Sequence, residues 1–267
     1  MEEIYEIWFS NLDIKNISKL QLFKKYSAKQ IYELNFEDMV RQDIEENVIV
    51  KILQNRSLEE AKRVRDYMQA KKVQLISCKN EKYPHKLQHI SDKPAFLYIR
   101  GNEAILDEDS VAIVGCRMAT TTGKTLARMI AKSLANRNIH IVSGLAIGID
   151  KYAHLGALDS EIGKTVAVLG CGLADEEVYP YQNKRIFERI LEKGGAIISE
   201  YGIGSKPEAK HFPARNRIIS GISDKVIVVE AKKRSGSLIT VDWALEQGRD
   251  VFAVPRQYSF SKFNWYE

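Results

Sequence analysis

The stretch that decides the fold is Ser110-Val111-Ala112-Ile113-Val114-Gly115-Cys116-Arg117. Its apolar residues do not alternate with polar ones and are rich in β-branched side chains, which predicts a strand buried on both faces in the middle of a parallel sheet. Apolar residues at helical spacing follow between Leu126 and Leu134. Unpaired N–H groups at the start of that helix would face the end of the strand, so we expect the turn between them to bind an anion.

Five similar apolar runs follow along the chain. The six runs start at residues 111, 139, 165, 196, 226 and 250, and the 24 to 31 residues between successive starts match one strand plus one helix. This rhythm predicts an α/β fold with a doubly wound, mostly parallel sheet of the Rossmann type. Two earlier runs, Val73–Ser77 and Pro94–Gly101, predict strands that extend the edge of this sheet. Ligands of such sheets lie beyond the carboxyl ends of the strands, so function is expected there.

The first 72 residues contain no convincing strand. Apolar residues recur every three or four positions within short segments, which predicts a small all-helical domain. The segments are Ile4–Phe9, Ile17–Tyr26, Ile31–Leu34, Glu45–Leu53 and Leu58–Ala70. Ser57 and Glu60 predict a capping box at the start of the last helix. Such a domain can bind DNA or pack against a neighbour, and packing is favoured because no glycine marks the turn of a DNA-binding helix pair.

The composition is that of a globular chain with a mild positive charge. Of 267 residues, 45% are apolar, and 40 Lys and Arg against 35 Asp and Glu give a net charge of +5. Cys78, Cys116 and Cys171 are far apart and fit no zinc or disulfide pattern, so we expect a reducing, cytoplasmic setting and no metal. The acidic N-terminus and the lack of an 18-residue apolar run argue against export or membrane insertion.

Two glycine motifs resemble nucleotide-binding loops but fail on spacing. Gly123-Lys124-Thr125 could end a phosphate loop, but Met118 stands where that loop needs its first glycine. Gly170-Cys171-Gly172 lacks the third glycine of a dinucleotide fingerprint, because Asp175 occupies that position. We therefore expect no cofactor.

The segment Ser143–Asp150 is a second candidate anion-binding turn, since glycines such as Gly144 allow close approach of a ligand. The alternative is that Asp150 only caps the helix that follows. His154 on that helix is interpreted as a hydrogen-bonded packing residue, because no nucleophile lies near it in sequence. Cys116 is interpreted as a small turn residue rather than a thiolate activated by a helix N-terminus.

The most distinctive stretch is Phe212-Pro213-Ala214-Arg215-Asn216-Arg217-Ile218-Ile219-Ser220-Gly221, with two arginines at a predicted helix start. We expect one arginine to point inward and pair with Glu200 or Glu230, and the other to point outward. Residues 232–240 show a similar pattern, in which basic residues are followed by hydroxyl side chains and a glycine at a predicted helix start. The basic residues expected around the strand ends are Arg117, Lys124, Lys184, Lys206, Lys210, Arg215, Arg217, Lys232, Lys233 and Arg234, opposed by Asp150, Glu200 and Glu230. These strand ends therefore form a mostly positive rim.

Six motifs along the chain together resemble the DNA-processing protein A (DprA or Smf) family. They are Gly115-x-Arg117, Ser143-Gly-Leu-Ala-x-Gly-Ile-Asp-x-x-Ala-His154, Tyr179-Pro180-x-x-Asn183, Ser199-Glu200, Phe212-Pro-x-Arg-Asn-Arg-Ile-Ile219 and Ser235-Gly-Ser-Leu-Ile-Thr240. The resemblance covers residues 83–255, and the helices before it agree with the family's SAM-like domain. It implies a non-catalytic protein that binds single-stranded DNA entering a bacterial cell during natural transformation, protects it and helps to load the RecA recombinase.

The resemblance also implies where DNA binds. It places the pocket at Arg117, Ser143, Gly144, Tyr181, Asn183, Lys184, Arg215, Asn216 and Arg217, and the second basic helix start adds Lys232, Ser235, Gly236 and Ser237. Tyr181 stands where some relatives have a lysine, and a tyrosine can stack on a base instead. The expected divisions are a helical domain (1–72), a connector with edge strands (73–103), an extended Rossmann-like DNA-binding domain (104–255) and a tail (256–267).

The tail is expected to depart from the family. Residues 256–267 are rich in aromatic side chains and do not align with the family's Pro-Gly turn and the segment through which relatives form a homodimer. A truncated or frame-shifted end, with poor dimerisation, is therefore expected.

The alternative function is enzymatic. A nucleotide-processing hydrolase of the lysine-decarboxylase-like Rossmann group also places a glycine-rich turn and an acid at strand ends, and Glu200 or Glu230 would then be the catalytic carboxylate. Residues 235–242 match the signature sequence of that group only in part. Since no nucleophile, base or metal cluster is evident at the strand ends, a binding protein without a catalytic centre is favoured.

Overall fold

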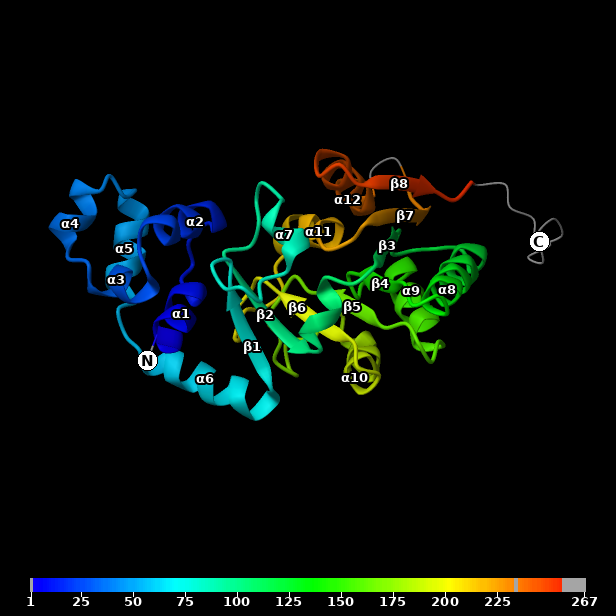
Figure 1. The fold of residues 1–267 in the computed structure, drawn as a ribbon, viewed down its shortest axis with the longest axis horizontal. Helices are drawn as coiled ribbons and strands as arrows, with labels where there is room; N and C mark the ends of the chain where they lie inside the picture. Colours follow the sequence, from blue (N-terminus) through cyan, green and yellow to red (C-terminus); the bar gives the residue numbers. More distant parts are fainter. Residues whose placement is uncertain (1, 233–234, 256–267) are drawn as a thin grey trace.

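An eight-stranded sheet forms the centre of the molecule (Figure 1), as seen in a computed structural model that describes residues 2–232 and 235–255. The strands are β1 (Val73–Ser77), β2 (Phe96–Gly101), β3 (Ser110–Gly115), β4 (His140–Ser143), β5 (Thr165–Val168), β6 (Ala196–Ser199), β7 (Lys225–Glu230) and β8 (Asp250–Ala253). Their order across the sheet is β1-β2-β6-β5-β4-β3-β7-β8. The last six begin within one residue of the predicted starts, and β3 lies centrally between β4 and β7, so the predicted fold class is confirmed.

The sheet is parallel from β6 to β8 and antiparallel at one edge. Strand β2 pairs antiparallel with β6, for example at Tyr98 opposite Ser199, and β1 pairs antiparallel with β2. The connector predicted from the sequence thus extends the sheet at its β6 side. All the other neighbouring pairs are parallel, which places the carboxyl ends of β3 to β7 at the same edge.

Helices cover both faces of the sheet. Buried side chains of α8 (Thr121–Ala135) and α9 (Ile149–Leu158) pack on one face, where α10 (Lys184–Glu192) also lies. The other face is covered by α7 (His85–Gln88), α11 (His211–Gly221) and α12 (Gly236–Glu246). Two short 3-10 helices, η1 (Glu103–Leu106) and η2 (Tyr181–Asn183), complete this part. This is the doubly wound arrangement that alternating strands and helices require.

Six helices precede the sheet: α1 (Glu2–Asn11), α2 (Asn16–Lys25), α3 (Ala28–Glu33), α4 (Phe36–Arg41), α5 (Glu46–Gln54) and α6 (Glu59–Lys71). The sequence patterns missed α4, a single short turn with a largely exposed face. The capping box predicted at Ser57 and Glu60 is wrong, because α6 begins at Glu59 and Ser57 accepts only from the Glu59 N–H. The box lies instead at α3, between Ser27 and Gln30.

The helical region and the sheet share one hydrophobic core. Phe9 of α1 and Phe23 of α2 both contact Phe96 of β2, with ring centroids 5.8 and 5.0 Å apart. Ser10 hydrogen-bonds the hydroxyl of Tyr98 at 2.6 Å. The junction between α6 and β1 coincides with the predicted boundary at residue 72, but the packing across it is continuous. Within the described residues, no helix is long and apolar enough to cross a membrane.

Candidate nucleic-acid interface

Two adjoining cavities open where the parallel strands end. The first, of about 710 Å³, lies between the end of β3, α11 and the start of α12; the second, of about 660 Å³, lies beside the turn after β4 and the loop of residues 176–182. The residues that line both are Arg117, Ala146, Tyr179, Pro207, Phe212 and Arg215. The cavities therefore meet at two arginines and two aromatic rings.

Arg215 reaches this junction from α11 and is almost completely buried, with 4% of its surface exposed. Its Nη1 donates to the carbonyl of Gly144 at 2.9 Å and to that of Val168. Gly144 is required here, since a Cβ at that position would lie 2.5 Å from Nη2 of Arg215. Burial lowers the pKa of Arg215, and the charge of Asp150 opposes that shift.

The charge of Arg215 is held by carbonyl dipoles rather than by an ion pair. No carboxylate in the described part of the chain lies within 4.0 Å of its nitrogens, and its buried Nε has no hydrogen-bond partner there. Burial of a guanidinium without an ion pair is costly. The charge of Asp150, which also lines the first cavity, offsets part of that cost, and an anion in the adjoining cavities would offset more. The floor of the site is thus built to accept negative charge.

Arg117 and three aromatic residues form the rim. The exposed guanidinium of Arg117 lies 5.5 Å from the ring centroid of Phe212, which lies 5.4 Å from that of Tyr179. Tyr181 is 72% exposed, and Nζ of Lys184 lies 5.7 Å from its ring centroid. The family resemblance implies that the Tyr179–Lys184 loop belongs to the pocket. Phe212 begins a motif of that resemblance but was not among the predicted DNA-binding residues; the available signal was an aromatic residue beside a basic one at a strand end.

The start of α12 completes the first cavity. The predicted residues that line it, besides the two arginines, are Asn216, Lys232, Ser235, Gly236 and Ser237. Ser235 is the N-cap of α12, and Asn216 donates to the carbonyl of Gly236 at 3.1 Å, which joins α11 to this helix start. Lys233 and Arg234 lie outside the described residues.

Four predicted site residues do not line either cavity. Ser143 and Asn183 are fully buried and donate to the carbonyls of Ile113 and Leu145, at 2.7 and 2.8 Å, so they hold the turns in place. Lys184 lies behind Tyr181. The fourth is Arg217, whose guanidinium forms a bidentate pair with Glu200. Contact of these four with DNA stays a prediction.

Comparison with known proteins places this site in a family. The profile of the family described as DNA recombination-mediator protein A matches residues 74–264. The chain belongs to this family. The match extends through residue 264, whereas residues 256–267 lie outside the described residues, so the predicted departure of the tail from the family stays a prediction.

Relatives agree over much of the fold. The DNA processing protein DprA of Streptococcus pneumoniae strain R6 is 46% identical over 180 residues, which are 67% of this chain and 62% of that protein. A solved structure of DprA from Streptococcus pneumoniae matches with a TM-score of 0.77 at 36% identity, over 95% of this chain and 87% of that one. A structure of DNA processing protein A from Helicobacter pylori, described for its single-stranded DNA binding mode, gives a TM-score of 0.62 at 32% identity, over 69% and 82%.

Two of the anion-binding turns predicted for this DprA-family chain are filled by the protein's own carboxylates. Glu230 accepts from both the N–H and the hydroxyl of Thr120, each at 3.0 Å, at the start of α8. Asp150 accepts from the Gly144 N–H at 3.1 Å and does not cap α9, whose N-cap is Gly148. Burial raises the pKa of Asp150, while Arg215 and the turn amides oppose that shift. A nearby acid thus already accepts from one backbone N–H group of each turn, while residues of both turns still line the cavities, and binding of a further anion there stays a prediction.

The prediction that one arginine of α11 points outward is also wrong. Arg217 is 2% exposed and Arg215 is 4% exposed, so both point inward. The predicted pairing with Glu200 is confirmed, with Nη2 of Arg217 2.6 Å from Oε2. Two residues with the same formal charge therefore differ in whether that charge is already neutralised.

The interpretations of His154 and Cys116 are confirmed. His154 is fully buried, with Nδ1 2.7 Å from the hydroxyl of Thr165 and Nε2 accepting from the Leu145 N–H at 3.3 Å. Burial, together with the charge of Arg215, lowers the pKa of His154 to about 3, so the ring is neutral. Burial raises the pKa of Cys116, and the nearby charge of Glu230 adds to that rise, so the thiol is not activated.

The carboxylates of the enzymatic alternative are both engaged in structural contacts. Glu200 binds Arg217, Glu230 binds Thr120, and neither lines either of the two cavities described above. Among the described residues, no group of three or more His, Cys, Asp or Glu side chains could hold a metal ion.

Proposed function

We propose that this chain is a single-stranded DNA-binding recombination mediator without a catalytic centre. It would act in the cytoplasm during natural transformation, protecting incoming DNA and helping to load the RecA recombinase. The observation that carries the proposal is the buried guanidinium of Arg215 at the junction of two cavities, with no carboxylate of the described residues within 4.0 Å of its nitrogens. A polyanion that follows the rim would add negative charge to that of Asp150.

The geometry supports a division of roles along the strand. Arg117, Arg215 and Lys232 would neutralise successive phosphates, and the start of α12 would donate N–H groups to another. Tyr179, Tyr181 and Phe212 offer faces on which bases stack whatever their sequence. Stacking needs unpaired bases, so this surface favours single strands over duplexes.

The relatives support this proposal and set its scope. The Helicobacter pylori protein is described by its single-stranded DNA binding mode, and its match covers 69% of this chain. The chain spans 62% of the Streptococcus pneumoniae DprA and 48% of the Escherichia coli protein Smf. Loading of RecA, which the family resemblance implies, is accordingly part of the proposal, and poor dimerisation of this chain stays a prediction.

A titration with labelled oligonucleotides at two salt concentrations tests the function. We expect tighter binding to single strands than to duplexes, little dependence on sequence, and a log–log salt slope of about −0.7 for each phosphate contact. Equal affinity at low and high salt contradicts a phosphate-binding rim. A parallel assay for release of base or phosphate from nucleotides distinguishes the hydrolase, which would show turnover.

A further inference from the structure

The second buried arginine of α11 has no role in the site as described so far. Its Nη1 and Nη2 donate to the two carboxylate oxygens of Glu200 at 2.7 and 2.6 Å, and the Glu200 side chain is only 10% exposed. Nε of Arg217 donates to the carbonyl of Asp92 at 2.7 Å and lies 3.0 Å from its carboxylate. Nη1 also donates to the carbonyl of Ala214, one turn back in α11. Arg217 is therefore held by partners from three segments.

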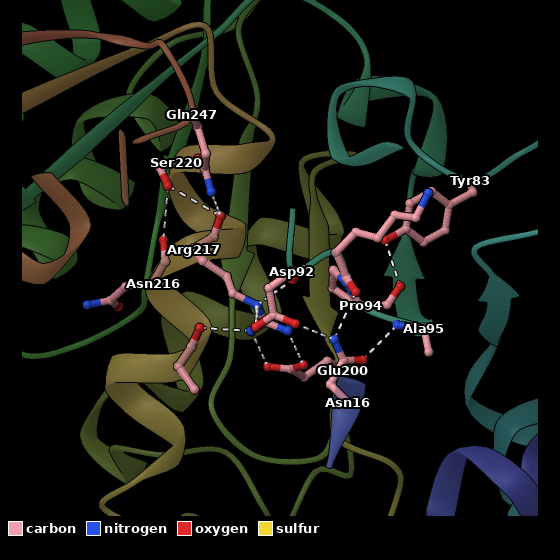
Figure 2. A network of polar contacts seen from close by, with 12 residues as sticks. Asn16, Tyr83, Asp92, Pro94, Ala95, Glu200, Asn216, Arg217, Ser220 and Gln247 are labelled. Atoms are coloured by element: carbon pink, nitrogen blue, oxygen red, sulfur yellow. Dashed lines mark hydrogen bonds and ion pairs between the residues drawn. The ribbon is translucent and has the colours of Figure 1, made fainter. Parts of the chain in front are cut away.

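These contacts continue into the helical region (Figure 2). Asn16, the first residue of α2, donates to the carboxylate of Asp92 at 2.7 Å and to the carbonyl of Lys93 at 2.9 Å. The side-chain oxygen of Asn16 accepts from the Ala95 N–H at 2.9 Å, just before β2. A chain of polar contacts thus runs from α2 through Asp92 to Arg217 and Glu200.

The same residue also links α11 to the end of α12. The backbone carbonyl of Arg217 accepts from the side-chain amide of Gln247 at 3.0 Å (Figure 2). The two helices it joins carry Arg215, Asn216 and the serines of the first cavity. Any shift of α11 would move the Arg215 guanidinium away from the carbonyls that hold it.

We infer that Arg217 is a positioning residue, which fixes α11 so that Arg215 faces the cavities, and that it is not a phosphate ligand. This inference rests on the proposed function. To reach a phosphate, Arg217 would have to abandon Glu200 and leave a buried carboxylate unpaired, which costs more than one charge-assisted hydrogen bond returns. The network in Figure 2 is then the support of the DNA site and its link to the N-terminal helices.

Opposite effects of one substitution separate the two roles. Glu200→Gln removes the partner charge. If Arg217 positions α11, binding of a single-stranded oligonucleotide weakens by about tenfold, equivalent to about 1.4 kcal/mol, and the salt slope is unchanged. If Arg217 is a phosphate ligand, Glu200→Gln frees its charge and binding tightens.

A double variant protects the test against unfolding. Arg217→Met together with Glu200→Leu removes both charges, a replacement that folded proteins often tolerate. We expect this variant to bind as weakly as Glu200→Gln, with the wild-type salt slope and faster amide exchange in α11. A salt slope reduced by about 0.7 overturns the inference, because it counts the loss of one phosphate contact.

A matched control is available on the opposite face of the sheet. Arg128 forms a similar bidentate pair with Asp159, at 2.6 and 3.0 Å, and lines neither cavity. Arg128→Met should leave binding and exchange in α11 unchanged. A wild-type chain that does not bind oligonucleotides contradicts the proposed function itself, whereas abnormal variants beside a binding wild type bear only on Arg217.

Discussion

Arg215 and Arg217 lie two positions apart on α11 but in opposite surroundings. Two helical residues rotate the side chain by about 200°, so the pair projects to nearly opposite sides of the helix. Arg215 meets two carbonyls and faces the cavities, whereas Arg217 meets two carboxylates and lies in the network of Figure 2. The difference teaches that a basic residue is available to a ligand only where the fold has not already supplied its counter-charge.

The largest effect is expected at the cavity side of this pair. Arg215→Met should weaken single-stranded DNA binding by about 2–3 kcal/mol, or roughly 30- to 150-fold, since the charged hydrogen-bond donor of the floor is lost. The salt slope should become shallower at the same time. Fluorescence anisotropy across a salt series measures both quantities.

The network side supplies the contrast for that experiment. Disruption of the pair between Arg217 and Glu200 should lower the affinity for single-stranded DNA without changing the salt slope. This variant and Arg215→Met should therefore differ in salt slope as well as in affinity. Equal salt slopes in Arg215→Met and the wild type would contradict the difference drawn between Arg215 and Arg217, because Arg215 would then be a structural residue too.

The next effect is expected at the rim. Arg117→Ala should weaken binding by ~1–3 kcal/mol, the range for a charge-assisted hydrogen bond. Its guanidinium is exposed and contacts the ring of Phe212, so the melting temperature should stay close to that of the wild type. Calorimetry alongside the binding titration checks both. Normal binding with a lowered melting temperature would make Arg117 a structural residue.

Acid should weaken the fold beneath Arg215. The unfolded chain protonates His154 near pH 6.5, but the buried ring in the folded chain has a pKa of about 3. Between these values the unfolded state binds more protons, so the free energy of unfolding falls as pH falls, by up to about 1.4 kcal/mol per pH unit. The raised pKa of Asp150 has the opposite sign and offsets part of this loss in the lower part of that range.

A variant isolates the histidine contribution. His154→Asn cannot titrate, so denaturant unfolding between pH 7 and pH 4.5 should show a shallower pH dependence than the wild type. Because Asp150 is present in both chains, its contribution cancels in the difference. Identical pH dependence in the two chains would show that His154 is protonated in the fold.

Local sequence patterns and the family resemblance predicted the fold and nine of the residues that line the two cavities, and long-range pairing explains what they missed. The apolar runs predicted β3 to β8. In β3 to β6, burial of both faces leaves a continuous run of apolar residues in the sequence. The turns after the strands predicted Arg117 and Ser235, because small turn residues and the start of a helix can also be recognised from a few neighbouring residues. Whether Glu230 would reach Thr120, or Asp150 the Gly144 amide, depends on side chains that the fold alone brings together. For the same reason, the sequence offered Glu200 as a partner for either arginine.

The smallest effect is expected where a carboxylate already fills a turn. Glu230→Gln keeps an oxygen that can accept from Thr120 but removes the charge at the start of α8. The free energy of unfolding should fall by about 0.3–1 kcal/mol, the usual strength of a charge at a helix N-terminus. Affinity for single-stranded DNA should stay within about twofold, or rise slightly at low salt, because one repulsive charge is lost near the rim. Paired unfolding and binding titrations measure these changes. A tenfold loss of affinity would instead make Glu230 a ligand-contacting acid, and the turn before α8 would then belong to the site together with the cavity of Arg215.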